Sequence, residues 1–205
     1  MAKFKSVKQL LQQKYKILEF EEPYASRYGH PEDNFKAMFY GSSGSGKSVE
    51  VIKFANYLAH NFGRVFYNSF EEGHGKTLQD RIIAHNIDST RISFGNKTPY
   101  DDMLEKVGRG KYKFIVIDSL QWMGLTYGQY QKMVDRYPKK SFIIISHAND
   151  KGEAKGRKDI LYAVDIKAHL HKGLLTVQSR FVQDGYVQER LFTPKSKKHT
   201  QLKMF

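Results

Sequence analysis

Apolar runs alternate with helical repeats along the middle of the chain. The runs at 36–40, 114–118 and 141–146 have the length and composition of strands that are buried on both faces of a sheet. Shorter runs at 64–70 and 91–94 predict two more strands. Between the runs, apolar residues recur every three or four positions, as they do along one face of an amphipathic helix. These repeats predict helices over residues 49–62, 77–83, 100–107 and 127–137.

The C-terminal part of the chain has a different pattern, in which apolar and polar residues alternate. Residues 164–170 predict a half-buried strand, with His169 and His171 on its polar face. These two histidines make a metal site only with a third ligand, so a solvated face is the alternative. Residues 174–192 form two runs around Gln183-Asp184-Gly185 and predict a β-hairpin. The whole order predicts an α/β fold, a mostly parallel twisted sheet flanked by helices with a C-terminal β-hairpin.

The residues before the first predicted strand form a separate segment. Residues 1 to about 20 combine lysines with leucines at helical spacing and predict a basic amphipathic helix. A proline-containing linker follows over residues 19–31. We expect this segment either to pack on its own core or to dock on a neighbouring subunit as an oligomerisation arm. The predicted organisation is an arm at 1–27, a core at 28–193 and a basic tail at 194–205.

Composition limits the class of protein. With 205 residues and 40% apolar content, the chain is long enough for one domain with a core of its own. The absence of cysteine excludes disulfides and thiolate metal sites. The sequence has no long apolar run and no hydrophobic signal core, so we expect a cytoplasmic protein with no membrane partner. The formal net charge of +13 suits a polyanion such as nucleic acid, although a solvated surface and a basic tail would give the same excess.

One segment carries a complete phosphate-loop pattern, a glycine followed by four residues and Gly-Lys-Ser. It lies between a predicted strand and a predicted helix, which is the context that the pattern requires. Its glycines are expected to turn the backbone with positive φ and to bring N–H groups close to a phosphate. Lys47 is expected to reach the β- and γ-phosphates of ATP, and the Ser48 hydroxyl to bind Mg²⁺. The predicted nucleotide-binding residues are Gly41, Ser42, Ser43, Gly44, Ser45, Gly46, Lys47, Ser48 and Val49.

Three candidate catalytic side chains follow predicted strands, where the ligands of open α/β sheets bind. Asp118 ends an apolar run and is expected to hold Mg²⁺ together with Ser48. Glu71 follows the second predicted strand and is a candidate base for the attacking water, although a solvated loop acid fits the position equally well. His147 follows the run that begins at Ser141; it either senses the γ-phosphate or belongs to an ordinary loop.

Three segments together resemble the RecA-like ATPases. Residues 67–73, Tyr-Asn-Ser-Phe-Glu-Glu-Gly, look like the family's strand ending in Ser-x-Glu-Glu or Ser-x-Glu-Met. Residues 115–121 are similar to the Ile-Ile-Asp-Ser-Ile-Gln of RadA/Sms, and residues 146–152 to its Gly-His-x-Thr-Lys-x-Gly. The resemblance runs over residues 28–193 and is closest to the RadA/Sms and DnaB-type cores; the chain also resembles the core-only RecA-like ATPases of Bacteroidetes and phages. It implies a RecA-like P-loop NTPase fold.

The resemblance also implies roles for single residues. Glu71 takes the place of the family's catalytic glutamate. The Lys-x-Arg finger, which a neighbouring subunit supplies in the family, matches Gln178-Ser179-Arg180, so Arg180 is kept and one cation is lost. Two DNA-binding loops of the family fall at 121–127 and 149–159. The candidate DNA contacts in them are Trp122, Tyr127, Lys151, Lys155, Arg157 and Lys158. The alternative is that the aromatic residues are interface core and the lysines are solvated.

The sequence therefore predicts a Mg²⁺-dependent, DNA-stimulated ATPase that forms a homo-oligomeric ring or filament. It is expected to act on single-stranded DNA in recombination, repair or replication. RadA's zinc finger and protease-like domain have no counterpart in this sequence, which argues against full motor activity. One alternative is an ATP-switched regulatory or assembly ATPase that binds no DNA, and another is a small-molecule phosphotransferase. The predicted catalytic residues are Lys47, Glu71, Asp118, His147 and Arg180.

Overall fold

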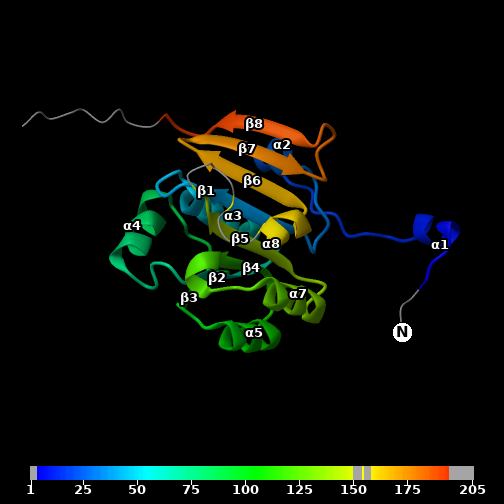
Figure 1. The fold of residues 1–205 in the computed structure, drawn as a ribbon, viewed down its shortest axis with the longest axis horizontal. Coiled ribbons are helices and arrows are strands. Elements are labelled where there is room, and N and C mark those ends of the chain that lie inside the picture. The colour runs from blue at the N-terminus through cyan, green and yellow to red at the C-terminus, as the bar shows by residue number, and fades with distance from the viewer. Residues whose placement is uncertain (1–3, 150–153, 155–157, 194–205) are drawn as a thin grey trace, which may run out of the picture.

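An eight-stranded sheet in the order β3-β2-β4-β5-β1-β6-β7-β8 runs through the molecule (Figure 1). The structure is a computed structural model that describes residues 4–149, 154 and 158–193. The strands are β1 (Lys36–Gly41), β2 (Arg64–Ser69), β3 (Ile92–Asn96), β4 (Tyr112–Asp118), β5 (Ser141–His147), β6 (Ile166–His171), β7 (Leu174–Ser179) and β8 (Tyr186–Arg190). The helices are α1 (Val7–Leu11), α2 (Tyr24–Tyr28), α3 (Lys47–Asn61), α4 (Lys76–Ala84), α5 (Tyr100–Arg109), α6 (Leu120–Met123), α7 (Tyr127–Arg136) and α8 (Lys158–Ala163).

The sheet is parallel from β3 to β6, and β7 and β8 extend it as an antiparallel hairpin. The central strands β1, β4 and β5 are buried along almost their whole length, as their continuous apolar runs predict. The predictions of a mostly parallel sheet and of a terminal hairpin are confirmed. Since β1 has β5 on one side and β6 on the other, the segment that follows β1 leaves the sheet near its middle.

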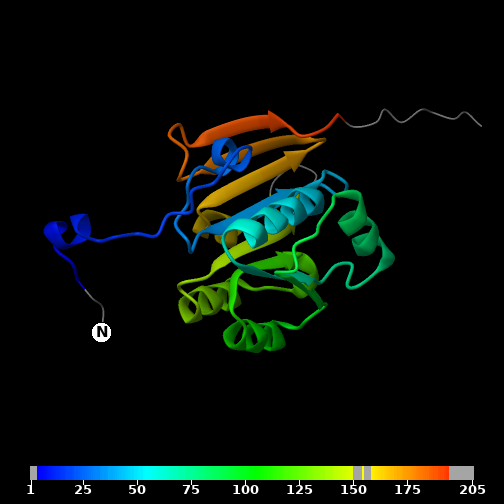
Figure 2. The ribbon, with the colours of Figure 1, turned by 180° about the vertical axis from the view of Figure 1, so that it is seen from behind.

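Helices on both faces of the sheet divide the core into two apolar layers (Figure 2). On one face α3 packs with α2 and α4, and its Phe54 and Leu58 are fully buried. On the other face lie α5, α6, α7 and α8, which bury Met103 and Met133 among their contacts. The amphipathic repeats in the sequence therefore identified the faces of α3, α5 and α7 that cover the sheet.

A buried ion network fastens α2 to α3 and β8. Arg27 donates from Nη1 to Glu50 Oε1 at 2.9 Å, and from Nε and Nη2 to the two oxygens of Glu189 at 2.7 Å each. The hydroxyl of Tyr28, which is fully buried, donates to the same Glu50 oxygen at 2.9 Å. Residues 19–31 are therefore not only a linker, as predicted, because α2 within them is part of the core.

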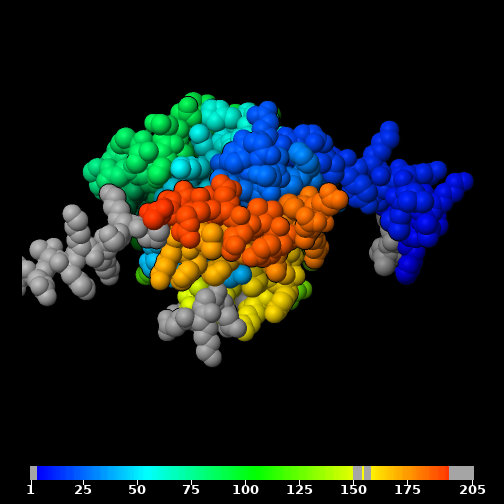
Figure 3. Space-filling model, turned by 90° about the horizontal axis from the view of Figure 1, so that it is seen from above, coloured from blue at the N-terminus to red at the C-terminus, as the bar shows by residue number. Residues whose placement is uncertain are grey.

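The prediction of a helix from residue 1 to about residue 20 is wrong in extent. From residue 4 onward, the structure has a helix only at Val7–Leu11, which Ser6 caps. The leucines of this helix are exposed because the arm stands away from the body of the molecule (Figure 3). Leu18 and Phe20 turn into the core instead, and side chains two residues apart share one face only in extended chain. The division into arm, core and tail stays a prediction, and the tail lies outside the described residues.

Smaller differences concern where elements begin and end. α4 begins after Gly75, so Thr77 lies inside the helix and is not its N-cap, as its position before the apolar repeat had suggested. α6 and α8 span four and six residues, which is too short for a helical repeat to show in the sequence. Lys158, expected in a loop, is the first residue of α8. Arg180 lies one residue beyond the end of β7 rather than on the strand.

Candidate functional site

The carboxyl ends of neighbouring parallel strands meet at one edge of the sheet. The register places Gly41 of β1 beside His147 of β5, and Ser69 of β2 beside Asp118 of β4. The phosphate loop follows β1 at this edge and leads into α3, and Glu71 follows β2. The structure thus brings together residues that are far apart in the sequence, in the way that parallel strands predict. Their chemical roles stay predictions.

The glycines of the phosphate loop are needed for two different reasons. Gly44 and Gly46 have φ angles of +72° and +100°, which favour glycine over any residue with a Cβ. Gly41 is not among the positive-φ residues; instead, a Cβ there would lie 2.0 Å from the carbonyl oxygen of Leu170 on β6. The expectation that all three glycines supply positive φ is therefore wrong for Gly41, which is required by the close approach of a neighbouring strand.

Lys47 is held inside the loop by the loop's own carbonyl groups. Its Nζ donates to the carbonyl oxygens of Gly41 at 3.0 Å and of Ser42 at 2.8 Å. Burial lowers the pKa of Lys47, and the carboxylates of Glu71 and Asp118 oppose that shift. α3 begins at Lys47 without a side-chain cap, and the first N–H groups of a helix are the groups at which helices bind anions. The lysine and the helix N-terminus therefore make this end of β1 attractive to phosphate.

Asp118 uses one carboxylate oxygen and leaves the other without a protein partner. Oδ2 accepts a hydrogen bond from the hydroxyl of Tyr67 at 2.9 Å. Oδ1 is buried, and no hydrogen-bond partner for it lies among the described residues. Burial raises the pKa of Asp118 to about 6, and the hydrogen bond from Tyr67 opposes that rise.

The free oxygen of Asp118 fits Mg²⁺ better than it fits a metal caged by protein. Mg²⁺ keeps several waters and takes one or two protein ligands together with phosphate oxygens. Asp118 and the Ser48 hydroxyl, in the first turn of α3, would hold such an ion. No group of three His, Cys, Asp or Glu side chains that could hold a metal ion occurs in the part of the chain that the structure describes.

The two adjacent glutamates after β2 have different partners. The N–H of Glu71 donates to the carbonyl oxygen of Asp118 at 2.9 Å, and its Oε2 lies 3.2 Å from Nε2 of His147. Glu72 instead forms a two-point ion pair with Arg81 of α4, at 2.7 and 2.8 Å. Arg81 was missed in the sequence, because a helical repeat does not show which polar residue turns back toward the loop before it.

Gln121 connects the segment after β4 to the end of β5. Its Nε2 donates to the hydroxyl of Ser146 at 2.8 Å, and its Oε1 accepts from the N–H of His147 at 3.0 Å. Gln121 lies in α6, next to Trp122, whose residue surface is 61% exposed. The exposed tryptophan is therefore one residue away from the hydrogen bonds that position the partner of Glu71.

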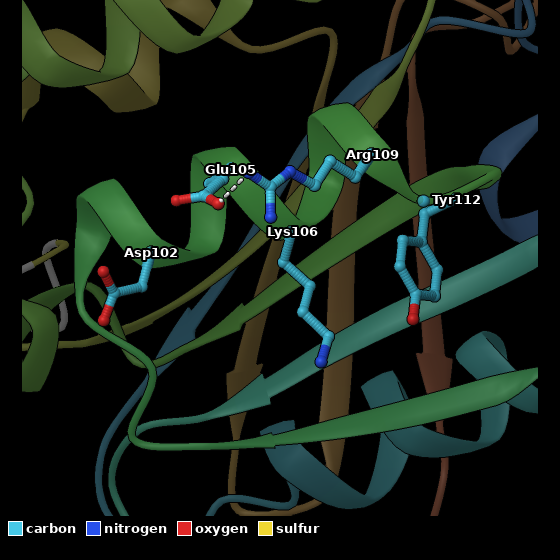
Figure 4. A pocket seen from close by; sticks show the side chains of 6 residues that line it. Asp102, Glu105, Lys106, Arg109 and Tyr112 are labelled. Atoms are coloured by element: carbon cyan, nitrogen blue, oxygen red, sulfur yellow. Dashed lines mark ion pairs between the residues drawn. The ribbon is translucent and has the colours of Figure 1, made fainter.

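The phosphate loop and the two glutamates line one hollow of about 230 Å³. Its lining residues are Ser43, Gly44, Gly46, Lys47, Ser48, Val49, Glu71, Glu72, Arg81, Ile145 and His147. A larger hollow of about 510 Å³ lies beside α5 (Figure 4), where Arg109 pairs with Glu105 at 2.7 Å and Lys106 extends from the helix. Its charged side chains are exposed and of both signs, and its elements are not those that lead into the phosphate loop. The chemistry therefore favours the smaller hollow.

Comparison with known proteins bears on the fold. The sequence matches no protein-family model and no curated protein sequence. One solved structure that is similar in three dimensions is the ATPase domain of a DnaB-like helicase, with a TM-score of 0.56 and 13% sequence identity. The similarity covers 77% of this chain and 81% of that chain. The chain has a RecA-like ATPase fold. The fold class predicted from the alternating pattern and the phosphate loop is therefore confirmed.

Within this RecA-like fold, the predicted DNA contacts lie in unlike surroundings. Trp122 is exposed, and Lys158 is exposed at the start of α8. Tyr127 is half-buried against the apolar layer that α5 to α8 cover, and it stacks on Tyr130 with ring centroids 6.3 Å apart. Its packing favours the alternative that this aromatic residue belongs to the core. The other three candidates, Lys151, Lys155 and Arg157, lie outside the described residues.

Arg180 lies at the opposite edge of the RecA-like sheet from the phosphate loop. The register pairs Ser179 with Ile166, and Ile166 with Ala37, whereas the loop follows Gly41 at the other end of β1. Four residues of strand correspond to about 13 Å, so Arg180 does not reach the phosphate loop of its own chain. Its guanidinium is exposed and pairs with Asp165 at 3.1 Å.

Two remaining expectations concern metals and membranes. His169 stacks on Tyr40, with ring centroids 4.8 Å apart, and His171 stacks beyond it at 6.3 Å. No third ligand for a metal joins them in the described residues, so this RecA-like fold favours a solvated histidine face. No helix within residues 4–149 or 158–193 is long and apolar enough to cross a membrane.

Proposed function

We propose that the chain binds ATP with Mg²⁺ and hydrolyses its terminal phosphoanhydride bond. The observation that carries the proposal is the buried, unpartnered Oδ1 of Asp118, at the same sheet edge as Lys47 and the uncapped start of α3. A Mg²⁺–triphosphate supplies a partner for each of these groups. Phosphate oxygens accept from Lys47 and from the helix N–H groups, and a water on the ion donates to Asp118.

Each side chain at this edge then has one task. Lys47 leaves the carbonyl groups of its own loop and binds the β- and γ-phosphates. Ser48 and Asp118 fix the position of Mg²⁺, which neutralises charge on the phosphoryl group during transfer. Glu71 accepts the proton of the attacking water. His147, 3.2 Å from Glu71, holds that carboxylate in place and lies where it contacts the γ-phosphate.

We extend the proposal to single-stranded DNA as a partner and to a homo-oligomer as the working state. The net charge of +13 favours a polyanion, and the exposed ring of Trp122 offers a surface on which a base can stack. Gln121 links that ring to His147, which supports a rate of hydrolysis that depends on DNA. Arg180 faces away from its own phosphate loop, which suits a residue that serves a neighbouring subunit.

One observation favours a second candidate, an ATP-switched regulatory or assembly ATPase that binds no DNA. Tyr127, one of the two predicted stacking residues, is packed into the core. Among the described residues, this leaves Trp122 and Lys158 as the predicted DNA contacts that are exposed. Two side chains on separate elements are few for a strand of nucleic acid, whose binding sites span several nucleotides.

The experiment that tests the proposal measures phosphate release from ATP, with and without Mg²⁺ and single-stranded DNA. Light scattering of the same samples gives the size of the assembly. We expect Mg²⁺-dependent turnover that DNA accelerates, and no turnover in a folded Lys47→Ala variant. Folded wild-type protein that binds no ATP would overturn the nucleotide site. Hydrolysis that is unchanged by DNA, together with no DNA binding at low salt, would select the regulatory ATPase.

A further inference from the structure

Glu72 and Arg81 form an ion pair inside the hollow at the phosphate loop. Arg81 Nη1 donates to Glu72 Oε2 at 2.8 Å and Nη2 donates to Oε1 at 2.7 Å, so the guanidinium fork holds both carboxylate oxygens. The side chains of Arg81 and Glu72 are 17% and 25% exposed. Both line the hollow together with Lys47 and Ser48. The pair therefore belongs to the surface that faces the nucleotide.

We propose that Arg81 contacts the terminal phosphate of bound ATP, and that Glu72 holds the guanidinium until the nucleotide arrives. The inference rests on the proposed function, since it requires a triphosphate in the hollow. It gives the site a second cation besides Lys47, supplied by the same chain and by a helix that no sequence motif marks. Arg81 is then a phosphate-contacting residue, and Glu72 acts through it as a positioning residue.

The exchange of partners follows from the chemistry of the guanidinium group. Its planar fork matches a carboxylate and a phosphate with the same two-point geometry. Without a nucleotide, Glu72 is the acceptor that neutralises Arg81 in a partly buried place. A terminal phosphate brings more negative charge than a carboxylate, and Glu72 is exposed enough to turn toward water. The charge of Arg81 already acts across the hollow, because it lowers the pKa of Asp118 against the effect of burial.

The ion pair is not needed to hold α4 in place. α4 is anchored by Leu78, which is 3% exposed in the apolar layer, and by Ile82, which packs against the same layer. The helix also has an ion pair of its own on its outer face, between Lys76 and Asp80. A guanidinium that faces the hollow adds little to this attachment, whereas its position suits contact with a ligand.

The test is the affinity for a non-hydrolysable ATP analogue and for ADP, each with Mg²⁺, measured by calorimetry on the full chain. The variants are Arg81→Gln, Arg81→Lys, Glu72→Gln and the double variant Arg81→Gln/Glu72→Gln. Arg109→Gln is the matched control, because Arg109 pairs with Glu105 on α5, outside this hollow. Thermal unfolding of every variant shows that it is folded. Lys47→Ala, measured in parallel, tests the proposed nucleotide site itself.

We expect Arg81→Gln to bind the ATP analogue about tenfold to a hundredfold more weakly, as for the loss of a charged hydrogen bond, with a much smaller change for ADP. Arg81→Lys, which keeps the charge but not the fork, should lie between Arg81→Gln and wild type. Glu72→Gln should bind the analogue more tightly, because the guanidinium no longer has a competing acceptor. That gain should vanish in the double variant, and Arg109→Gln should behave as wild type.

Three results would overturn the inference. Arg81→Gln could weaken the analogue and ADP equally, or neither of them, which would mean that Arg81 does not contact the third phosphate. The gain from Glu72→Gln could be larger without Arg81 than with it, which is the result of simple repulsion between Glu72 and the nucleotide. In each of these cases, binding that depends on Lys47 leaves the proposed function standing. If wild type and Lys47→Ala both bind no nucleotide, the proposed function fails, and this inference fails with it.

Discussion

At the scale of single residues, Glu71 differs from Glu72 in what its side chain meets. Glu71 lies beside His147 at 3.2 Å, and its backbone is tied to Asp118. Glu72 is occupied by Arg81. A carboxylate that is to accept a proton from water must be within hydrogen-bond reach of that water and free of a competing cation. Glu71 meets this condition in the structure, and Glu72 does not.

We therefore expect Glu71→Gln to bind ATP normally and to hydrolyse it roughly 10²–10⁴-fold more slowly, the usual contribution of a general base. Glu72→Gln is the matched control, with the same change one residue away, and it should keep most of the turnover. Single-turnover phosphate release and nucleotide affinity measured on both variants check the prediction. The reverse order of sensitivity would assign the base to Glu72.

The sequence predicts some residues of this site and not others, for a physical reason. Glu71, Asp118 and His147 follow strands, and parallel strands bring their carboxyl ends to one edge, so position in the chain is enough. Arg81 comes from a helix that turns back over the loop, and no spacing rule gives the direction of that return. Gly41 was recognised through its motif, but its need for glycine comes from Leu170 on a strand far along the chain.

At the scale of elements, α2 depends on charges that are buried together. Glu50 of α3 is 5% exposed, and its oxygen accepts from both Arg27 and Tyr28. A carboxylate at such a place is stable only while its partners are present. The same guanidinium also holds Glu189 of β8, so one side chain joins α2 both to the helix that follows the phosphate loop and to the hairpin.

Arg27→Ala should lower the free energy of unfolding by about 3–5 kcal/mol, since it leaves Glu50 buried without its cation. The matched control is Arg109→Ala, which breaks an exposed ion pair with Glu105 and should cost at most about 1 kcal/mol. Urea unfolding of both variants measures the difference. Equal effects of the two substitutions would show that the network is no more important than a surface pair.

The pH dependence of stability offers a separate test of the same network. The hydrogen bond from Arg27 lowers the pKa of Glu189 below its ordinary value of 4.5. A lowered pKa in the folded state stabilises the protein above the unfolded-state pKa, and this contribution disappears as the pH falls through the folded-state value. Between about pH 5 and about pH 3, the free energy of unfolding of Glu189→Gln should therefore fall less steeply than that of wild type. Parallel curves for the two proteins would contradict the assignment.

Long elements could be predicted from the sequence, and short ones could not. The helices α3, α5 and α7 have 10 to 15 residues, enough for the apolar repeat to show. α2, α6 and α8 have four to six residues and follow from tertiary contacts such as the bond between Gln121 and His147. The N-terminal arm shows the opposite error, since its apolar repeat has no partner surface along most of its length.

At the scale of the whole molecule, the nucleotide site and Arg180 lie at opposite edges of the sheet. If Arg180 serves a neighbour, turnover per subunit should rise with protein concentration, and Arg180→Ala should bind ATP but hydrolyse it slowly. A mixture of Arg180→Ala with Glu71→Gln should regain activity, because some interfaces then combine an intact glutamate with an intact arginine. Phosphate release from the mixture and from each variant alone measures the rescue.

The control for this experiment is Arg190→Ala, which removes an exposed arginine of β8 from the same hairpin. It should leave both turnover and its concentration dependence unchanged. A wild-type rate for Arg180→Ala, with turnover that does not vary with concentration and no rescue in the mixture, would remove the shared site. The nucleotide site would stand in that case, because Lys47, Glu71 and Asp118 belong to one chain.

Trp122 on α6 has a consequence of a different kind, because it is the only tryptophan in the sequence. All of the indole fluorescence of the protein therefore comes from one exposed ring, next to the glutamine that holds the end of β5. In the free protein we expect the red-shifted emission of a solvated indole, open to quenching by acrylamide. A base that stacks on the ring would quench it, and a nucleotide that draws His147 toward its γ-phosphate would shift the emission through Gln121. The native protein thus has an optical signal for both ligands without any attached dye.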